Sequence, residues 1–140
     1  MRRKTFGLVL LFVLSLALVA CATPEEKAKQ EADPNIVPTN YKQEILDTLM
    51  TSLSDPTNVR DAFITEPALQ TAGREPRYIV CVRFNARNPS RQYAGSKDLI
   101  GVFYGGHLNQ LIDPTKDQCV NAAYRPFPEL EKLCFAKKCE

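Results

Sequence analysis

Residues 77–84 read RYIVCVRF, and this stretch decides the fold. Aromatic or apolar side chains occupy every second position from 78 to 84, and two of the three positions between them are also apolar. Alternation is typical of a strand, and apolar residues on both of its faces indicate a strand that is covered on both sides. The stretch therefore predicts the central strand of a β-sheet.

A hairpin is expected after this strand. Two further β-type runs, 99–104 and 107–112, flank the pair Gly105-Gly106. A two-residue hairpin turn needs positive φ at both central residues, which glycine adopts readily. His107 then begins a strand beside the turn, and we expect its side chain to be solvated or hydrogen-bonded rather than catalytic.

An amphipathic helix is expected ahead of the strands. Apolar side chains recur every fourth residue, at Tyr41, Ile45, Leu49 and Leu53. Thr39 or Asn40 can cap the start of this helix, and Asp55-Pro56 can end it. The apolar face predicts packing against the sheet.

Two shorter elements complete the expected fold. Residues 59–65 mix β-forming and charged residues between two prolines, which suits a short edge strand. Near the C-terminus, Pro126 and Pro128 can open a short helix that presents Phe127, Leu130 and Leu133. Together these elements predict an α+β fold, with the N-terminal helix packed on a roughly four-stranded antiparallel sheet and a short C-terminal helix.

The N-terminus has the pattern of an export signal. Arg2, Arg3 and Lys4 precede an apolar run over residues 6–20, in which Ser15 is the one clearly polar residue. As a helix this run spans roughly 22 Å, short of the ~30 Å hydrocarbon core of a membrane. We therefore expect a cleaved signal and not a permanent spanning helix.

Leu18-Val19-Ala20-Cys21 resembles the lipobox of bacterial lipoproteins. The resemblance implies that residues 1–20 are a signal peptide and that Cys21 carries diacylglycerol, usually with an acylated new N-terminus. Two or three acyl chains anchor a protein stably at a membrane, and no other cofactor is expected. Ala22 differs from the aspartate that commonly retains such lipoproteins in the inner membrane of Gram-negative bacteria, which favours the outer membrane. The alternative is an ordinary signal peptide with a chance cysteine.

Composition divides the mature chain into a tether and one domain. Residues 22–39 hold three prolines and six charged residues, so 21–39 is expected to be the lipidated cysteine and a flexible tether, followed by a single domain over 40–140. Residues 1–21 hold three of the 18 basic residues and none of the 16 acidic ones, which leaves 15 basic and 16 acidic residues. A nearly neutral exported chain is not expected to bind nucleic acid.

Four cysteines remain beside Cys21: Cys81, Cys119, Cys134 and Cys139. An even number in a small exported domain indicates disulfides. Cys81 lies in the central strand pattern and Cys119 follows the later strands, so we expect these two to pair across the sheet, and Cys134 to pair with Cys139. On a helix the last two would point about 140° apart, so Cys119 with Cys134 is the rival pairing. Zinc binding is a third alternative, although no C-x-x-C motif is present and the single histidine is distant in sequence.

The sequence carries no familiar catalytic signature, such as G-x-S-x-G, a phosphate-binding loop or a dinucleotide fingerprint. Its main asymmetry is charge, because residues 74–97 contain six basic residues and one acidic residue. Within this region NARNPSRQYAG is polar and rich in turn formers, which suits contact with an anionic or carbohydrate surface, unless its charges simply face water. The expected contact surface consists of Arg83, Asn85, Arg87, Asn88, Arg91 and Tyr93.

The segments DPTNVRDA, VCVRFNARN and YAGSKD together resemble a group of small, uncharacterised cell-envelope lipoproteins of alphaproteobacteria. This resemblance covers about residues 41–104 and implies no particular activity. We expect a non-catalytic interaction module, tethered to the membrane and facing the periplasm, that binds an envelope protein or an anionic or carbohydrate surface. The alternatives are a structural accessory of an envelope assembly, acting through its apolar helix or C-terminal segment, and, third, a small periplasmic enzyme.

Overall fold

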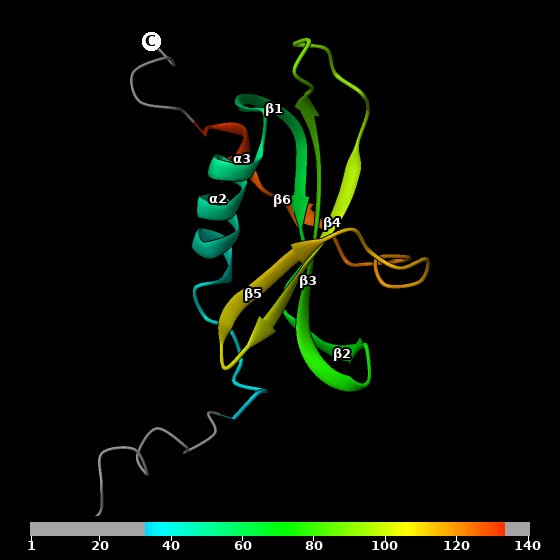
Figure 1. Ribbon diagram of the computed structural model, residues 1–140. Helices are drawn as coiled ribbons and strands as arrows, with labels where there is room; N and C mark the ends of the chain where they lie inside the picture. Colours follow the sequence, from blue (N-terminus) through cyan, green and yellow to red (C-terminus); the bar gives the residue numbers. More distant parts are fainter. Residues whose placement is uncertain (1–32, 134–140) are drawn as a thin grey trace, which may run out of the picture. The chain divides into compact units, whose positions relative to one another are not determined.

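The computed structural model describes residues 33–133. This part of the chain combines a sheet of six antiparallel strands with two helices (Figure 1). The predicted mixture of helices with an antiparallel sheet is confirmed, whereas the expected number of about four strands is wrong. The expected signal peptide, Cys21, Cys134 and Cys139 lie outside the described residues.

The elements follow one another in the order α2 (Tyr41–Ser52), β1 (Asp55–Ile64), β2 (Ala68–Ala72), β3 (Glu75–Arg87), β4 (Lys97–Tyr104), β5 (His107–Ile112), β6 (Arg125–Pro126) and α3 (Pro128–Glu131). Across the sheet the strand order is β5-β4-β3-β1-β6, and β2 pairs with β3. The strand predicted from RYIVCVRF is therefore central, as expected.

β1 and β2 lie end to end along the same side of β3. β1 pairs with residues 82–87 of β3, and β2 pairs with residues 75–79. Between them Thr65 remains bonded to β3, because its N–H donates to the carbonyl of Cys81 and its hydroxyl accepts from the Cys81 N–H. The strand expected at 59–65 is thus longer than predicted, and the prediction of an edge position is wrong, since β1 lies between β3 and β6.

One face of the sheet is covered by α2 (Figure 1). The core on this side contains Ile45, Leu46, Leu49, Val59, Ala62, Ile64, Val80, Val82, Phe84, Phe103, Phe127 and Leu130. Complete burial of one large apolar side chain contributes about 1.5–3 kcal/mol. The predicted C-terminal helix is confirmed as α3, and it places Leu130 in this core beside Phe127.

The β4–β5 hairpin turns at Gly105 and Gly106, whose φ angles are 57° and 84°. Positive φ at both positions is the conformation that the Gly-Gly pair predicted. His107 pairs with Tyr104 across the turn and contacts the Glu44 carboxylate of α2 at 3.1 Å. Glu44 also accepts the N–H of Leu108, so it joins the helix to β5. The expectation of a solvated or hydrogen-bonded His107 side chain is confirmed.

The opposite face of the sheet is closed by a disulfide. Cys81 of β3 and Cys119 are bonded, with their Cα atoms 5.9 Å apart, as the sequence predicted. Both are buried with Ile100, and Tyr124 packs against them. Because neighbouring residues of a strand face opposite sides, Val80 and Val82 contact the α2 side while Cys81 holds the loop on the other side.

Residues 33–39, assigned to the tether from sequence, include positions that pack against the domain. Pro38 is fully buried, and the Gly105 N–H of the hairpin turn donates to the carbonyl of Pro34 at 3.2 Å. The packed part of the chain therefore begins before α2. Within residues 33–133 no helix is long and apolar enough to cross a membrane.

Removing the disulfide is expected to lower stability substantially. The bond joins residues 38 positions apart, and closing a loop of that length contributes about 4 kcal/mol through the entropy of the unfolded chain. The variant Cys81→Ala with Cys119→Ala should lose about this much free energy of unfolding in urea denaturation. Val120→Ala, at the exposed position that follows Cys119, is the control and should unfold like the native chain. A loss below about 1 kcal/mol in the double variant contradicts the prediction.

Candidate functional site

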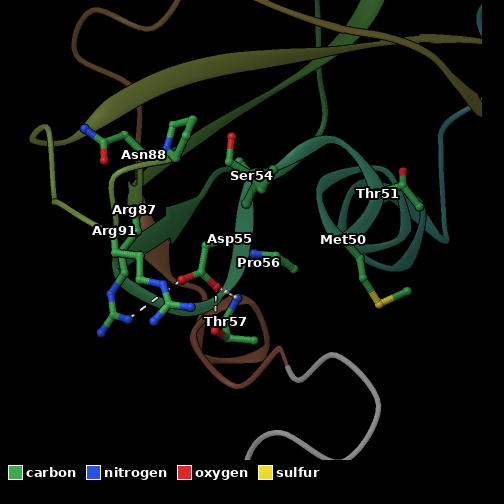
Figure 2. Close-up of a pocket in the computed structure, with 11 residues that line it drawn as sticks. Met50, Thr51, Ser54, Asp55, Pro56, Thr57, Arg87, Asn88 and Arg91 are labelled. Atoms are coloured by element: carbon green, nitrogen blue, oxygen red, sulfur yellow. Dashed lines mark hydrogen bonds and ion pairs between the residues drawn. The ribbon is translucent and has the colours of Figure 1, made fainter.

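A cleft of about 740 Å³ lies where the end of α2, the start of β1 and the end of β3 meet. Its lining comprises Met50, Thr51, Leu53, Ser54, Asp55, Pro56, Thr57, Arg87, Asn88, Pro89 and Arg91. Figure 2 shows these residues as sticks, with Arg87 and Arg91 extending towards Asp55. The cleft therefore joins two segments that are 30 residues apart in sequence.

Asp55 enters the cleft because the chain leaves the helix abruptly. α2 ends at Ser52, Leu53 is already extended, and Pro56 disfavours helical backbone at the residue before it. The N–H and the hydroxyl of Thr57 both donate to Oδ1 of Asp55, at 3.0 and 2.5 Å. These bonds, with the nearby charges of Arg87 and Arg91, hold the pKa of Asp55 below its ordinary value of 3.8. Asp55 is a fixed negative charge at neutral pH.

Arg87 stands opposite Asp55 in the register of β1 and β3. Its guanidinium nitrogen lies 3.8 Å from Oδ2 of Asp55, whereas a charge-assisted hydrogen bond is about 2.7–2.9 Å long. The two groups attract each other without a hydrogen bond, and no other described residue accepts from this guanidinium. Arg87 therefore has half-buried donors that are not used within the described part of the chain.

Arg91 is presented by a loop that the backbone closes tightly. The N–H of Arg91 donates to the carbonyl of Asn88, and the N–H of Asn88 donates to the carbonyl of Gln92. The Asn88 side chain accepts from Gln92 N–H as well. These bonds hold Arg91 at a φ of 60°, a left-handed conformation that costs roughly 1–2 kcal/mol in a residue with a side chain. The exposed guanidinium has no ion pair with any residue among 33–133.

Tyr93 fixes the loop to the strands on both sides. Its backbone bridges to Arg87, and its hydroxyl donates to the carbonyl of Asn58 in β1 at 2.7 Å. The guanidinium groups of Arg60 and Arg87 lie 4.4 and 5.4 Å from the centre of its ring. Attraction of two cations to one aromatic ring stabilises the positions of both arginines. The Tyr93 ring thus supports Arg87 from outside the cleft.

Arg83 is engaged elsewhere. Its guanidinium donates two hydrogen bonds to the Asp98 carboxylate, at 2.7 and 2.8 Å, and stacks 4.5 Å from the ring centre of Tyr124. These bonds lower the pKa of Asp98, and burial together with the Asp98 charge raises the pKa of Tyr124 to about 12. Arg83 therefore secures the loop that carries Tyr124 against β4.

The structure brings together some of the residues predicted as a contact surface. Arg87, Asn88 and Arg91 line the cleft, and Tyr93 touches Arg87 from beside it. Arg83 and Asn85 belong to the same strand but not to the lining, and the Asn85 Oδ1 is buried without a hydrogen-bond partner among the described residues.

The sequence analysis missed Asp55 and Thr57 as members of this site and treated Asp55-Pro56 only as a helix stop. An aspartate two residues before a threonine is a known signal for a side-chain-closed turn, but only the fold places that turn beside Arg87.

The described residues that line this cleft include no histidine or cysteine. His107 lies at the hairpin turn, and Cys81 and Cys119 are bonded to each other. Over residues 33–133 no group of three or more His, Cys, Asp and Glu side chains is arranged to hold a metal ion.

Comparison with protein-family models, curated proteins and solved structures finds no match to this chain.

Acid should destabilise the domain through its paired carboxylates. The folded pKa values of Asp55 and Asp98 are depressed, so their contribution is present above the unfolded pKa and is lost as pH falls through the folded values. The urea midpoint should therefore drop as the pH falls below about 4. Asp98→Asn should be less stable at neutral pH and show a shallower acid decline.

Asp113→Asn is the matched control, because Asp113 forms an exposed pair with Lys97. It should follow the native pH curve. An Asp98→Asn variant whose acid decline is as steep as that of the native chain contradicts the assignment.

Proposed function

We propose that the protein is a membrane-anchored, non-catalytic binding module of the bacterial cell envelope, facing the periplasm. The lipobox around Cys21 supports the lipid anchor, and the polar segment after it is the tether between the membrane and the folded domain. The contact surface is the cleft that contains Arg87 and Arg91. One observation carries this proposal: two arginines meet a single carboxylate in the cleft, so one positive charge is unmatched by its lining.

A binding role is favoured by the loop, whose shape is fixed before any partner arrives. The hydrogen bonds at Asn88 and the contacts of Tyr93 hold the arginines in place. A partner then binds without the entropy cost of ordering the loop. Long-range attraction by the excess charge favours anionic surfaces and makes binding sensitive to salt.

The structural-accessory alternative needs a free apolar surface. In the described residues the apolar face of α2 is used in the core, where Ile45 and Leu49 are fully buried, and Leu130 of α3 is buried as well. Assembly through these two helices is therefore less favoured than binding through the cleft.

Anchoring is tested by removing the lipobox together with its signal. The native chain expressed in a Gram-negative bacterium should sediment with membranes and be released by detergent, and its mass should show lipid on Cys21. Residues 22–140 exported behind a cleavable signal that has no lipobox should appear in the soluble periplasmic fraction. A native chain without lipid, or a lipobox-free chain that stays in the membrane fraction, contradicts the anchor.

Binding is tested with isolated envelope fragments of the bacterium that encodes the protein and with the mature chain carrying Cys21→Ala. The bound fraction should decrease as salt rises and should fall about tenfold in Arg87→Ala with Arg91→Ala, because charged contacts supply the attraction. Arg74→Ala removes a charge from the turn between β2 and β3 and is the control. Equal losses in both variants contradict the role of the cleft.

A further inference from the structure

The described residues supply too few acceptors and too little negative charge for the two arginines of the cleft. Within residues 33–133 the Arg87 guanidinium has no hydrogen-bond acceptor, and Arg91 has no ion pair. Asp55 lies near both, but its Oδ1 already accepts two hydrogen bonds from Thr57. The site therefore offers up to ten guanidinium N–H donors, at about five per arginine, to an incoming acceptor.

The placement of the two arginines favours a phosphate group over a carboxylate. A carboxylate is planar and is satisfied by the paired N–H groups of one guanidinium. A phosphate presents at least two further oxygens in other directions and carries up to about two negative charges. Arg87 projects from a strand end and Arg91 from the loop tip, so they approach from different parts of the backbone.

The other part of the cleft is less polar. Met50, Leu53, Pro56 and Pro89 belong to the lining. Figure 2 shows Pro56 and Met50 on the side of Asp55 away from the arginines. An apolar group attached to the phosphate has a surface to cover there, and burial of that surface adds to affinity.

We propose that this cleft binds an organic phosphate, with the phosphate on Arg87 and Arg91 and its apolar substituent against Met50 and Pro56. This inference rests on the proposed function and specifies the ligand of the same site. Asp55 tunes the affinity, because its fixed negative charge repels the phosphate while it holds Arg87 in place. The ligand is either a soluble phosphate ester or the phosphate of a lipid headgroup.

The first experiment titrates phenyl phosphate, inorganic phosphate and benzyl alcohol into the mature chain carrying Cys21→Ala, at low salt, with backbone and arginine NMR signals as the readout. Phenyl phosphate should bind saturably and about tenfold more tightly than inorganic phosphate, because its ring covers apolar surface. Benzyl alcohol should not bind. Shifted signals should centre on Arg87, Arg91 and Asp55.

Four variants separate the contributions. Arg87→Ala and Arg91→Ala should each weaken phenyl phosphate about tenfold or more, whereas Arg74→Ala should change it less than about twofold. Asp55→Asn keeps an oxygen acceptor for Thr57 but removes the charge, so it should bind several-fold more tightly. All variants should first show native far-ultraviolet circular dichroism and an intact Cys81–Cys119 bond.

Met50→Ser tests the apolar contact. It should weaken phenyl phosphate and leave inorganic phosphate unchanged, because the thioether contacts only the substituent. A variant that weakens both ligands equally overturns the proposed orientation.

Vesicles distinguish the two sources of the phosphate. Binding of phosphatidylglycerol vesicles, but not phosphatidylcholine vesicles, with the same dependence on Arg87 and Arg91, identifies a lipid headgroup. Binding of phenyl phosphate without vesicle binding identifies a soluble ester.

Failure of this inference can be separated from failure of the proposed function. Absence of saturable phenyl phosphate and vesicle binding, or equal effects of Arg74→Ala and Arg91→Ala, overturns the phosphate site. If envelope binding still depends on Arg87 and Arg91 in that case, the binding module stands with another ligand. If phosphate binds but envelope binding does not depend on either arginine, the phosphate site stands and the proposed function fails.

Discussion

The pairing of β3 along both of its sides is the constraint on which the rest of the structure depends. This 13-residue strand is bonded to β4 on one side and to β1 and β2 on the other. Its alternating side chains enter two separate cores, so Val80 and Val82 hold α2 while Cys81 holds the loop of Cys119. A disturbance of this strand would therefore affect both faces and every strand paired with it, whereas β5 and β6 each pair with one strand.

The candidate site is a continuation of the same strand. β3 ends at Arg87, and the chain then forms the loop closed by Asn88 and returns past Tyr93. The Tyr93 hydroxyl and the Arg60 side chain bind this return to β1, whose left-handed residues Asn58 and Asp61 interrupt its regular register with β3. Such irregularities are common where a sheet presents functional side chains, because they redirect the strand without opening the core. The cleft is in this way supported by backbone that is itself held by the sheet.

The elements that sequence reasoning predicted are those with a strong local pattern. RYIVCVRF, the Gly-Gly hairpin and the proline-led C-terminal helix each contain their own signal, and all three are present. β2 and β6 lack such a signal. The β2 sequence ALQTA has little apolar alternation, and β6 has only two residues, Arg125-Pro126. Each is a strand because it pairs with a longer one, β2 with β3 and β6 with β1. Among the residues that line the cleft, Arg87 and Arg91 belong to the basic, turn-rich segment that the sequence analysis selected. Two contacts depend on strand register, which local sequence patterns do not define: the ion pair of Arg83 with Asp98, and the approach of Asp55 to Arg87.

The central claim is that β3 and Tyr93 hold the two arginines in a preformed arrangement. Backbone ¹⁵N relaxation of residues 87–93, measured on residues 22–140, tests it most directly. Order parameters of about 0.85, equal to those of β3 and β4, are the result that the account predicts. Values below about 0.6 across the loop, with a rigid β3, would contradict it, because the arginines would then have no fixed position before a partner binds.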